Sequence, residues 1–120
     1  MKLNHVNLCV PDVKESKAFF EQFFGFTCTA EKGDGIIAIL KGSDNFLLVI
    51  SKLEEGIGPA YPREFHIGFM QDTRQQVTAI FEALKAGGIA VERAPKKIRD
   101  SFGFYFIAPG GIMIEVASPL

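Results

Sequence analysis

Two histidines occupy equivalent positions in two similar stretches of the chain, and Glu115 could complete a metal site with them. Aligning His5 with His66 brings other matching pairs into register: Val6 with Ile67, Leu8 with Phe69, Phe20 with Phe81 and Glu21 with Glu82. Such self-similarity indicates a duplicated unit. Glu115 stands in the apolar stretch 112–117. A carboxylate there costs free energy unless it is exposed, paired or bound to a metal.

This set of donors suits a divalent metal. Two imidazoles and one carboxylate fit Fe(II), Mn(II), Ni(II) or Zn(II), and three protein ligands leave coordination positions open for water and substrate. A histidine in a strand is more often a hydrogen-bonded residue than a ligand, and that alternative applies to His5 and His66. Their equivalent positions in a repeat, together with Glu115, favour the metal site.

The strand pattern predicts that these side chains share the helix-free sides of their sheets. Side chains alternate along a strand, so His5 and Asn7 lie on one face of the stretch 3–10. The opposite face is apolar and can pack on a helix: Val6, Leu8 and Val10. By the same alternation, His66 and Glu115 point away from their apolar neighbours, which are Phe65, Ile67, Ile114 and Val116. Asn7 is then a candidate for hydrogen bonding to a bound substrate.

The elements that must carry these residues repeat in the order strand, helix, strands. Asp12 is a candidate helix N-cap with Glu15 three residues later, and Gly25 marks the helix end. The first unit is predicted to contain a strand at 3–10, a helix at 13–24 and strands at 26–31, 36–41 and 45–51. The second is predicted to contain a strand at 65–70, a helix from Asp72-Thr73 to Gly87-Gly88, strands at 89–93, 102–108 and 112–117, and a polar loop at 94–101.

These elements predict one domain, 1–120, rather than two. It comprises unit one (1–52), a connector with two Gly and two Pro (53–63) and unit two (64–120). The phenylalanines of the first helix are expected to pack in the core, as a helix laid on a sheet requires, rather than to form an aromatic ligand cage.

The composition limits the partners that the chain can have. Its 120 residues are 48% hydrophobic and include twelve Phe, enough for a core without disulfides. A net charge of −1 provides no basic field for nucleic acid or acidic lipid. Cys9 and Cys28 are expected to be free thiols of a cytoplasmic protein. No signal peptide and no membrane-spanning segment are predicted, which leaves small molecules or another protein as partners.

Several motifs together are similar to those of a known family. They are Leu3-Asn4-His5-Val6, Val10-Pro11-Asp12, Phe19-Phe20 and Phe24-Gly25-Phe26, then Phe104-Tyr105-Phe106, Pro109-Gly110-Gly111 and Ile114-Glu115-Val116. Over its whole length the chain resembles the vicinal oxygen chelate superfamily, also called the glyoxalase/bleomycin-resistance/extradiol dioxygenase family. The resemblance implies an α+β fold of two tandem βαβββ units forming a curved mixed sheet around a central cleft. The family's metal ligands, on the first and last strand of each unit, fall at His5, His66 and Glu115.

The chain also departs from the family pattern. The fourth ligand position falls within 46–50, at Leu48, where glyoxalase I and methylmalonyl-CoA epimerase carry Glu or Gln. The fosfomycin-resistance thiol transferases use two His and one Glu, and Tyr105 matches a substrate-binding Tyr of theirs. However, Asn7 replaces their Thr, Ala108 replaces the usual Asp of the hairpin turn, and their C-terminal basic residue has no counterpart in this sequence.

The resemblance implies a metal-dependent enzyme for a small oxygenated substrate, whether a lyase, isomerase, thiol transferase or dioxygenase. Glu115 and Tyr105 are the candidate catalytic residues, and Asn7, Tyr105 and Arg99 the candidate substrate-binding residues. Tyr105 in an aromatic strand could equally be a packing residue, and Arg99 could belong to a solvated charged loop. The alternative function is a non-catalytic drug- or metabolite-binding protein of the bleomycin-resistance type. Family analogy further predicts a homodimer.

Overall fold

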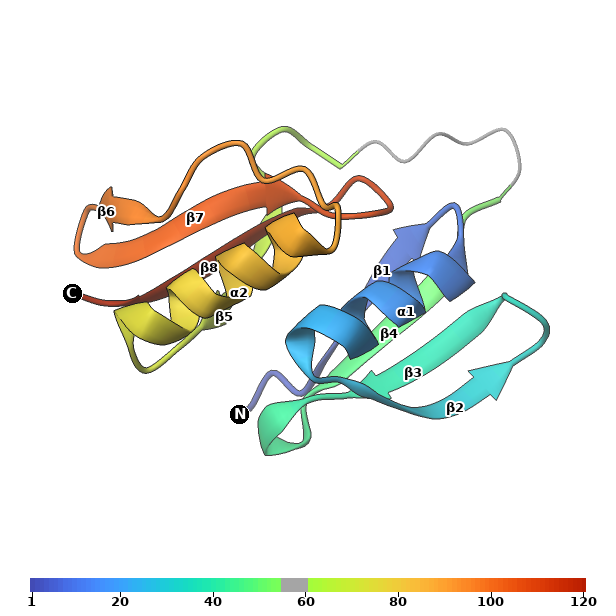
Figure 1. Cartoon of the computed structure of the whole chain (residues 1–120). Helices are drawn as coiled ribbons and strands as arrows, with labels where there is room; N and C mark the ends of the chain where they lie inside the picture. Colours follow the sequence, from blue (N-terminus) through green and yellow to red (C-terminus); the bar gives the residue numbers. More distant parts are fainter. Residues whose placement is uncertain (55–60) are drawn as a thin grey trace. The chain divides into compact units, whose positions relative to one another are not determined.

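The chain forms two compact units of similar construction. The computed structural model describes residues 1–54 and 61–120, and its contacts divide the chain into Met1–Ala60 and Tyr61–Leu120 (Figure 1). Most of the predicted connector, residues 55–60, lies outside the described residues. None of the helices in the described ranges is long and apolar enough to cross a membrane.

The first unit is a four-stranded mixed sheet with one α-helix. Its elements are β1 (His5–Val10), α1 (Val13–Phe24), β2 (Thr27–Lys32), β3 (Ile37–Lys41), a 3₁₀ turn at Ser43–Asn45 and β4 (Leu47–Lys52). The strand order is β1-β4-β3-β2. The β1–β4 pair is parallel, and the β3–β4 and β2–β3 pairs are antiparallel. Parallel strands need a crossover connection, and α1 is part of the connection that follows β1.

The second unit repeats this plan. Its elements are β5 (His66–Met70), α2 (Arg74–Ala86), β6 (Lys96–Ile98), β7 (Ser101–Ile107) and β8 (Met113–Pro119). The strand order is β5-β8-β7-β6, with β5 and β8 parallel and the other pairs antiparallel. The predicted fold class, α+β with two tandem βαβββ units, is therefore confirmed.

Local sequence sets the helix ends. The Asp12 side chain accepts a hydrogen bond from the backbone N–H of Glu15, and Gly25 adopts a left-handed conformation (φ 68°) after the last turn. The predicted helix at 13–24 is therefore confirmed at both ends. At the start of α2, Thr73 and Gln76 cap each other reciprocally in a capping box.

Each helix packs on the central strands of its own sheet and leaves the other face uncovered by a helix (Figure 1). The buried side chains of the first unit come from both layers, and they include Leu8, Phe20, Leu40, Leu48 and Ile50. Phe19 and Phe20 are buried and make ring contacts with each other, which confirms their assignment to the core. The helix-free face of each sheet is where the candidate site residues project.

The predicted strand at 89–93 is wrong. This segment instead completes the end of α2. The N–H of Ile89 donates to the carbonyl of Leu84, and the N–H of Gly88 donates to the carbonyl of Lys85. Gly88 is left-handed (φ 82°). These two hydrogen bonds form a Schellman cap. They use the N–H groups of Gly88 and Ile89, which a strand would need for pairing with a neighbouring strand. The edge strand β6 lies within the segment predicted as a loop, where Lys96 and Lys97 place charge on the sheet edge.

Candidate functional site

His66 and Glu115 meet on the helix-free face of the second unit. The strands β5 and β8 are parallel neighbours whose register places Gly68 opposite Glu115. The His66 Nε2 atom lies 3.3 Å from Glu115 Oε2, and both side chains are partly exposed. A Cβ atom at Gly68 would stand 3.7 Å from the same carboxylate oxygen, which is an ordinary contact distance.

A backbone contact orients the His66 imidazole. Its Nδ1 atom lies 2.9 Å from the carbonyl oxygen of Glu64. A carbonyl oxygen can only accept, so Nδ1 carries a proton, and Nε2 is the ring atom that is turned toward Glu115. Metal-bound histidines are commonly held in this way, by a hydrogen bond from the second ring nitrogen.

The spacing of the two donor atoms fits a shared metal ion. Metal–ligand bonds of about 2.0–2.2 Å at angles between 90° and 109° place two donor atoms roughly 3–3.4 Å apart. The 3.3 Å separation between His66 Nε2 and Glu115 Oε2 lies in this range. It also fits a weak ion pair with a protonated His66. Across residues 1–54 and 61–120, the structure gathers no group of three His, Cys, Asp or Glu side chains around one point.

Tyr105 completes the cluster within the second unit. The β7–β8 register places Tyr105 opposite Glu115, and its ring meets the His66 ring edge-on with centroids 5.4 Å apart. Burial raises the pKa of Tyr105, and the charge of Glu115 and a hydrogen bond to its carboxylate raise the pKa further. Tyr105 therefore stays protonated at neutral pH and acts as a hydrogen-bond donor to Glu115.

His5 and Asn7 lie on the helix-free face of the first unit. The Nδ1 atom of His5 is 2.7 Å from the side-chain oxygen of Asn4, an arrangement like that of His66 with Glu64. The Oδ1 atom of Asn7 accepts a hydrogen bond of 2.5 Å from the Ser51 hydroxyl on β4. The Asn7 side chain is thus held in place, and its amide N–H groups remain to donate.

The fourth position of the family pattern is Val49, not Leu48. In the second unit, Glu115 stands opposite Gly68, two residues after His66. The equivalent position in the first unit is the one opposite Asn7, two residues after His5, and Val49 occupies it. Leu48 points to the helix side and is 1% exposed. The fourth position is apolar, as predicted, but the residue that occupies it is Val49 rather than Leu48.

Arg99 lies in the turn between β6 and β7. Its backbone is left-handed (φ 52°), which is uncommon for a residue other than Gly, Asn or Asp, and the Ser101 hydroxyl closes the turn on the carbonyl of Ile98. The positive charge of Arg99 lowers the pKa of Tyr105, against the larger effects that raise it. Arg99 is thus electrostatically coupled to the cluster of the second unit.

A pocket that the sequence did not indicate lies beside this cluster. Its volume is about 370 Å³, and the described residues that line it belong to the second unit. The segment after α2 contributes Glu92 and Arg93, and Tyr105, Ile107 and Met113 come from β7 and β8. The sequence pattern predicts a strand at 89–93, and a strand there gives no reason to expect these side chains at a pocket.

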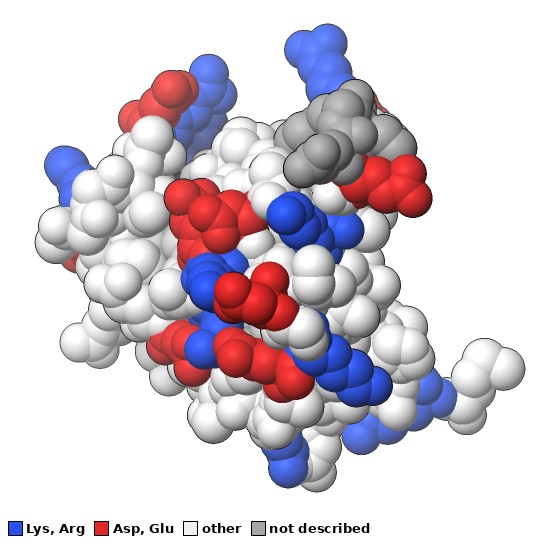
Figure 2. All heavy atoms as spheres, turned by 90° about the vertical axis from the view of Figure 1, so that its right-hand side faces the viewer, with Lys and Arg blue, Asp and Glu red and all other residues white. Residues whose placement is uncertain are grey.

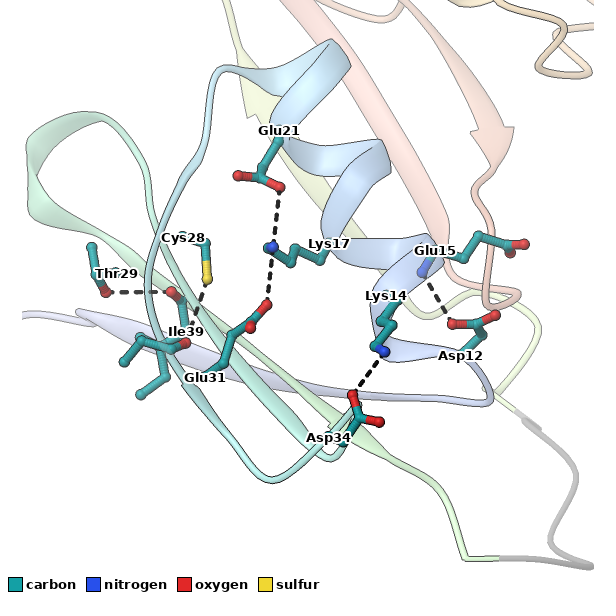
Figure 3. Close-up of polar contacts among 11 residues, drawn as sticks. Asp12, Lys14, Glu15, Lys17, Glu21, Cys28, Thr29, Glu31, Asp34 and Ile39 are labelled. Carbon is teal, nitrogen blue, oxygen red and sulfur yellow. Dashed lines mark hydrogen bonds and ion pairs between the residues drawn. The ribbon is translucent and has the colours of Figure 1, made fainter.

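Several charged side chains of the first unit pair with one another. Figure 2 shows acidic and basic side chains interspersed on one face of the molecule. Within the first unit, Lys14 pairs with Asp34 at 2.7 Å, and Lys17 pairs with Glu31 at 2.9 Å and with Glu21 at 3.8 Å (Figure 3). On this face the two signs alternate, so the side chains shown form no extended positive patch of the kind that binds nucleic acid.

Comparison with known proteins identifies the family. The model of the Glyoxalase/Bleomycin resistance protein/Dioxygenase superfamily matches residues 2–116. A solved structure described as a possible glyoxalase from Bacillus cereus is 37% identical, with a TM-score of 0.83 and 97% of each chain covered. No curated protein matches the sequence significantly.

More distant structures share the fold. A lactoylglutathione lyase from Agrobacterium tumefaciens is 19% identical, with a TM-score of 0.76 and coverage of 98% of this chain and 92% of the other. A genomically encoded fosfomycin resistance protein from Listeria monocytogenes is 17% identical, with a TM-score of 0.80 and coverage of 100% and 94%. At these identities the likeness extends to the fold alone, which these proteins use for different reactions.

Proposed function

Because the chain belongs to the Glyoxalase/Bleomycin resistance protein/Dioxygenase superfamily, we propose that it is a metal-dependent enzyme for a small oxygenated substrate. The proposed metal ligands are His5, His66 and Glu115. The observation that carries the proposal is the 3.3 Å approach of His66 Nε2 to Glu115 Oε2, with His66 oriented by a backbone carbonyl. Divalent metals are typical of the superfamily.

The residues around this pair have separate roles in the proposed reaction. A bound divalent ion would supply Lewis acidity toward substrate oxygens. Tyr105 donates a hydrogen bond to the Glu115 carboxylate, which orients it and disperses its charge. Glu115 is the group that would hold or release a proton at a carboxylate oxygen. Asn7 and Arg99 are proposed to bind substrate oxygens through an amide N–H and a guanidinium.

The reaction class stays open among lyase, isomerase, thiol transferase and dioxygenase. Relatives with the same fold include a lactoylglutathione lyase and a fosfomycin resistance protein, so the fold does not choose between these chemistries. The relative at 37% identity is described as a possible glyoxalase, which supports an enzyme in general. The proposal is therefore made for the metal site and not for one substrate.

The role of His5 can be tested by metal content. We expect protein incubated with Fe(II), Mn(II), Ni(II) or Zn(II) and then desalted to retain about one ion per chain, measured by elemental mass spectrometry. His5→Ala should weaken binding at least tenfold, since it removes one of three protein ligands. Lys2→Ala, an exposed substitution in the same terminal segment, should bind like the wild type.

Two outcomes would contradict parts of this proposal. Unchanged metal affinity in His5→Ala would remove His5 from the ligand set and leave His66 and Glu115 as the site. No metal in the wild type under any of these conditions would favour the second candidate, a non-catalytic drug- or metabolite-binding protein. The pocket of about 370 Å³, with its apolar walls, is the observation that supports that candidate.

We further propose a homodimer by family analogy. The exposure of large apolar side chains, among them Leu3 at 79% and Met70 at 70%, supports an association surface. Light scattering at micromolar concentration should give twice the chain mass of 13.2 kDa, and the mass of a single chain would contradict the dimer. A cytoplasmic location is also proposed, supported by Cys9 and Cys28, which form no disulfide with each other.

A further inference from the structure

We propose that the pocket beside Tyr105 is a subsite for an anionic group carried on an apolar body, with Arg93 as the residue that selects the anion. Its use as a substrate subsite rests on the proposed function. The binding itself needs no metal ion, because every wall residue belongs to the second unit and lies outside the proposed ligand set. The two proposals can therefore fail independently.

The pocket has the construction of a small-molecule site. Its volume of about 370 Å³ lies within the range of such sites, which combine apolar walls with a few polar groups. Ile107 is 54% exposed and Met113 is partly exposed, so their side chains offer apolar surface that a ligand would cover. Covering such surface removes it from water and thereby favours binding.

The polar groups of the pocket are Glu92 and Arg93. Neither side chain forms an ion pair with any residue in the ranges 1–54 and 61–120. A guanidinium has five N–H donors in a planar fork that matches a carboxylate or phosphonate. Arg93 is therefore a cation at the pocket that makes no ion pair within the described residues, and Glu92 places one carboxylate in the same wall.

The pocket also leads to the candidate metal site. Tyr105, one of its walls, hydrogen-bonds Glu115, and the backbone of Met113 is the register partner of His66. Along β7, Ile107 and Tyr105 are about 7 Å apart by the rise per residue. A ligand whose anion is held by Arg93 would therefore share the pocket with Ile107 and Tyr105.

Glu92 provides a second test, in which the change in anion affinity should have the opposite sign. Its carboxylate lines the same pocket, so it repels an anion that Arg93 attracts. Removing each charge should then change affinity in opposite directions: Arg93→Gln weakens anion binding and Glu92→Gln strengthens it. Both side chains are exposed, so neither substitution should affect folding.

The experiment uses the metal-free protein of 120 residues. The probe is phenylacetate, and phenylacetamide, which carries no charge, is the control ligand. Binding is followed by NMR through the methyl resonances of Met113 and Ile107. We expect phenylacetate to shift both signals and Arg93→Gln to weaken its binding about two- to fivefold, the effect of an exposed contact between opposite charges. Lys85→Gln, which removes an exposed positive charge on α2 away from the pocket walls, should bind like the wild type.

Three results would overturn the inference: no shift at Met113 and Ile107, equal affinity for phenylacetate and phenylacetamide, or unchanged binding in Arg93→Gln. Weaker phenylacetate binding in Glu92→Gln would also overturn it, because Glu92 would then support the ligand rather than repel it. Metal content is measured on parallel samples of the same proteins after incubation with metal ions and desalting. Probe binding lost with metal retained contradicts the subsite alone, and metal absent with probe binding intact contradicts the proposed enzyme alone.

Discussion

Glu115→Ala should reduce the metal content of the protein from about one ion per chain to nearly none. The substitution removes the one anionic member of the proposed ligand set, and it leaves His66 Nε2 without the oxygen that lies 3.3 Å away. Loss of groups that merely orient a ligand costs 10–100-fold in metal affinity, so loss of a ligand should cost more than about 100-fold. The measurement is elemental mass spectrometry after incubation with metal and desalting.

Thermal unfolding supplies a second measurement of the same effect. A ligand at 100 times its dissociation constant stabilises the folded state by about 2.7 kcal/mol. Adding metal should therefore raise the melting temperature of the wild type and leave that of Glu115→Ala unchanged. Glu82→Ala, which removes an exposed carboxylate from α2 of the same unit, should behave like the wild type. Metal binding that survives in Glu115→Ala would make the His66–Glu115 contact an ion pair with a structural role.

Gly103→Ala should destabilise the second unit by about 3 kcal/mol, the upper part of the usual range for overpacking a core. A Cβ atom at Gly103 would overlap the carbonyl oxygen of Val116 and lie 2.8 Å from the Cβ of Ala117. These atoms belong to β8, the central strand that carries Glu115, and backbone cannot move aside as a flexible side chain can. A loss of this size is a large share of the 5–15 kcal/mol that stabilises a typical domain.

Gly68→Ala is the matched control for this prediction. Gly68 is also a strand glycine of the second sheet, but a Cβ atom there meets its first neighbour, the Glu115 carboxylate, at an ordinary contact distance of 3.7 Å. Its effect on stability should stay below about 1 kcal/mol, and Ala is the better strand residue of the two. Urea unfolding of both variants gives the comparison, and equal midpoints would contradict the steric argument.

The fold was predictable where local signals agree with tertiary packing. Asp12 and Gly25 mark the ends of α1 by capping chemistry, which depends on neighbouring residues only. The repeated strand–helix–strands order could be predicted because side-chain alternation and helical spacing are strong in both units. The pairing that makes β6 out of Lys96–Ile98 depends instead on the partner strand β7, which no local pattern reveals.

The segment after α2 shows how a local signal can mislead. Ile89 and Val91 have the branched side chains that favour a strand, yet Gly88 and Ile89 complete the cap of the helix. The path of the chain that follows takes Glu92 and Arg93 to the pocket. Their position there depends on this cap, and so the sequence pattern alone gave no reason to single them out.

The candidate site was partly predictable from symmetry. The repeat pointed to His66, and alternation along β8 placed Glu115 on the same helix-free side, where the structure brings the two together. The fourth position was assigned to Leu48 rather than Val49, because a run of apolar residues does not show which of its members faces which side. The metal itself and the role of His5 stay predictions.

The strands that carry His66 and Glu115 are the first and the last of the second unit, and they pair directly with each other. The imidazole and the carboxylate therefore come together only after the whole intervening chain has folded back on itself. An ion held by both would act as a clip across that closed loop, and it would oppose opening through the entropy of loop closure. Occupancy at this pair would thus report that β5 and β8 have come together, and metal would slow their separation.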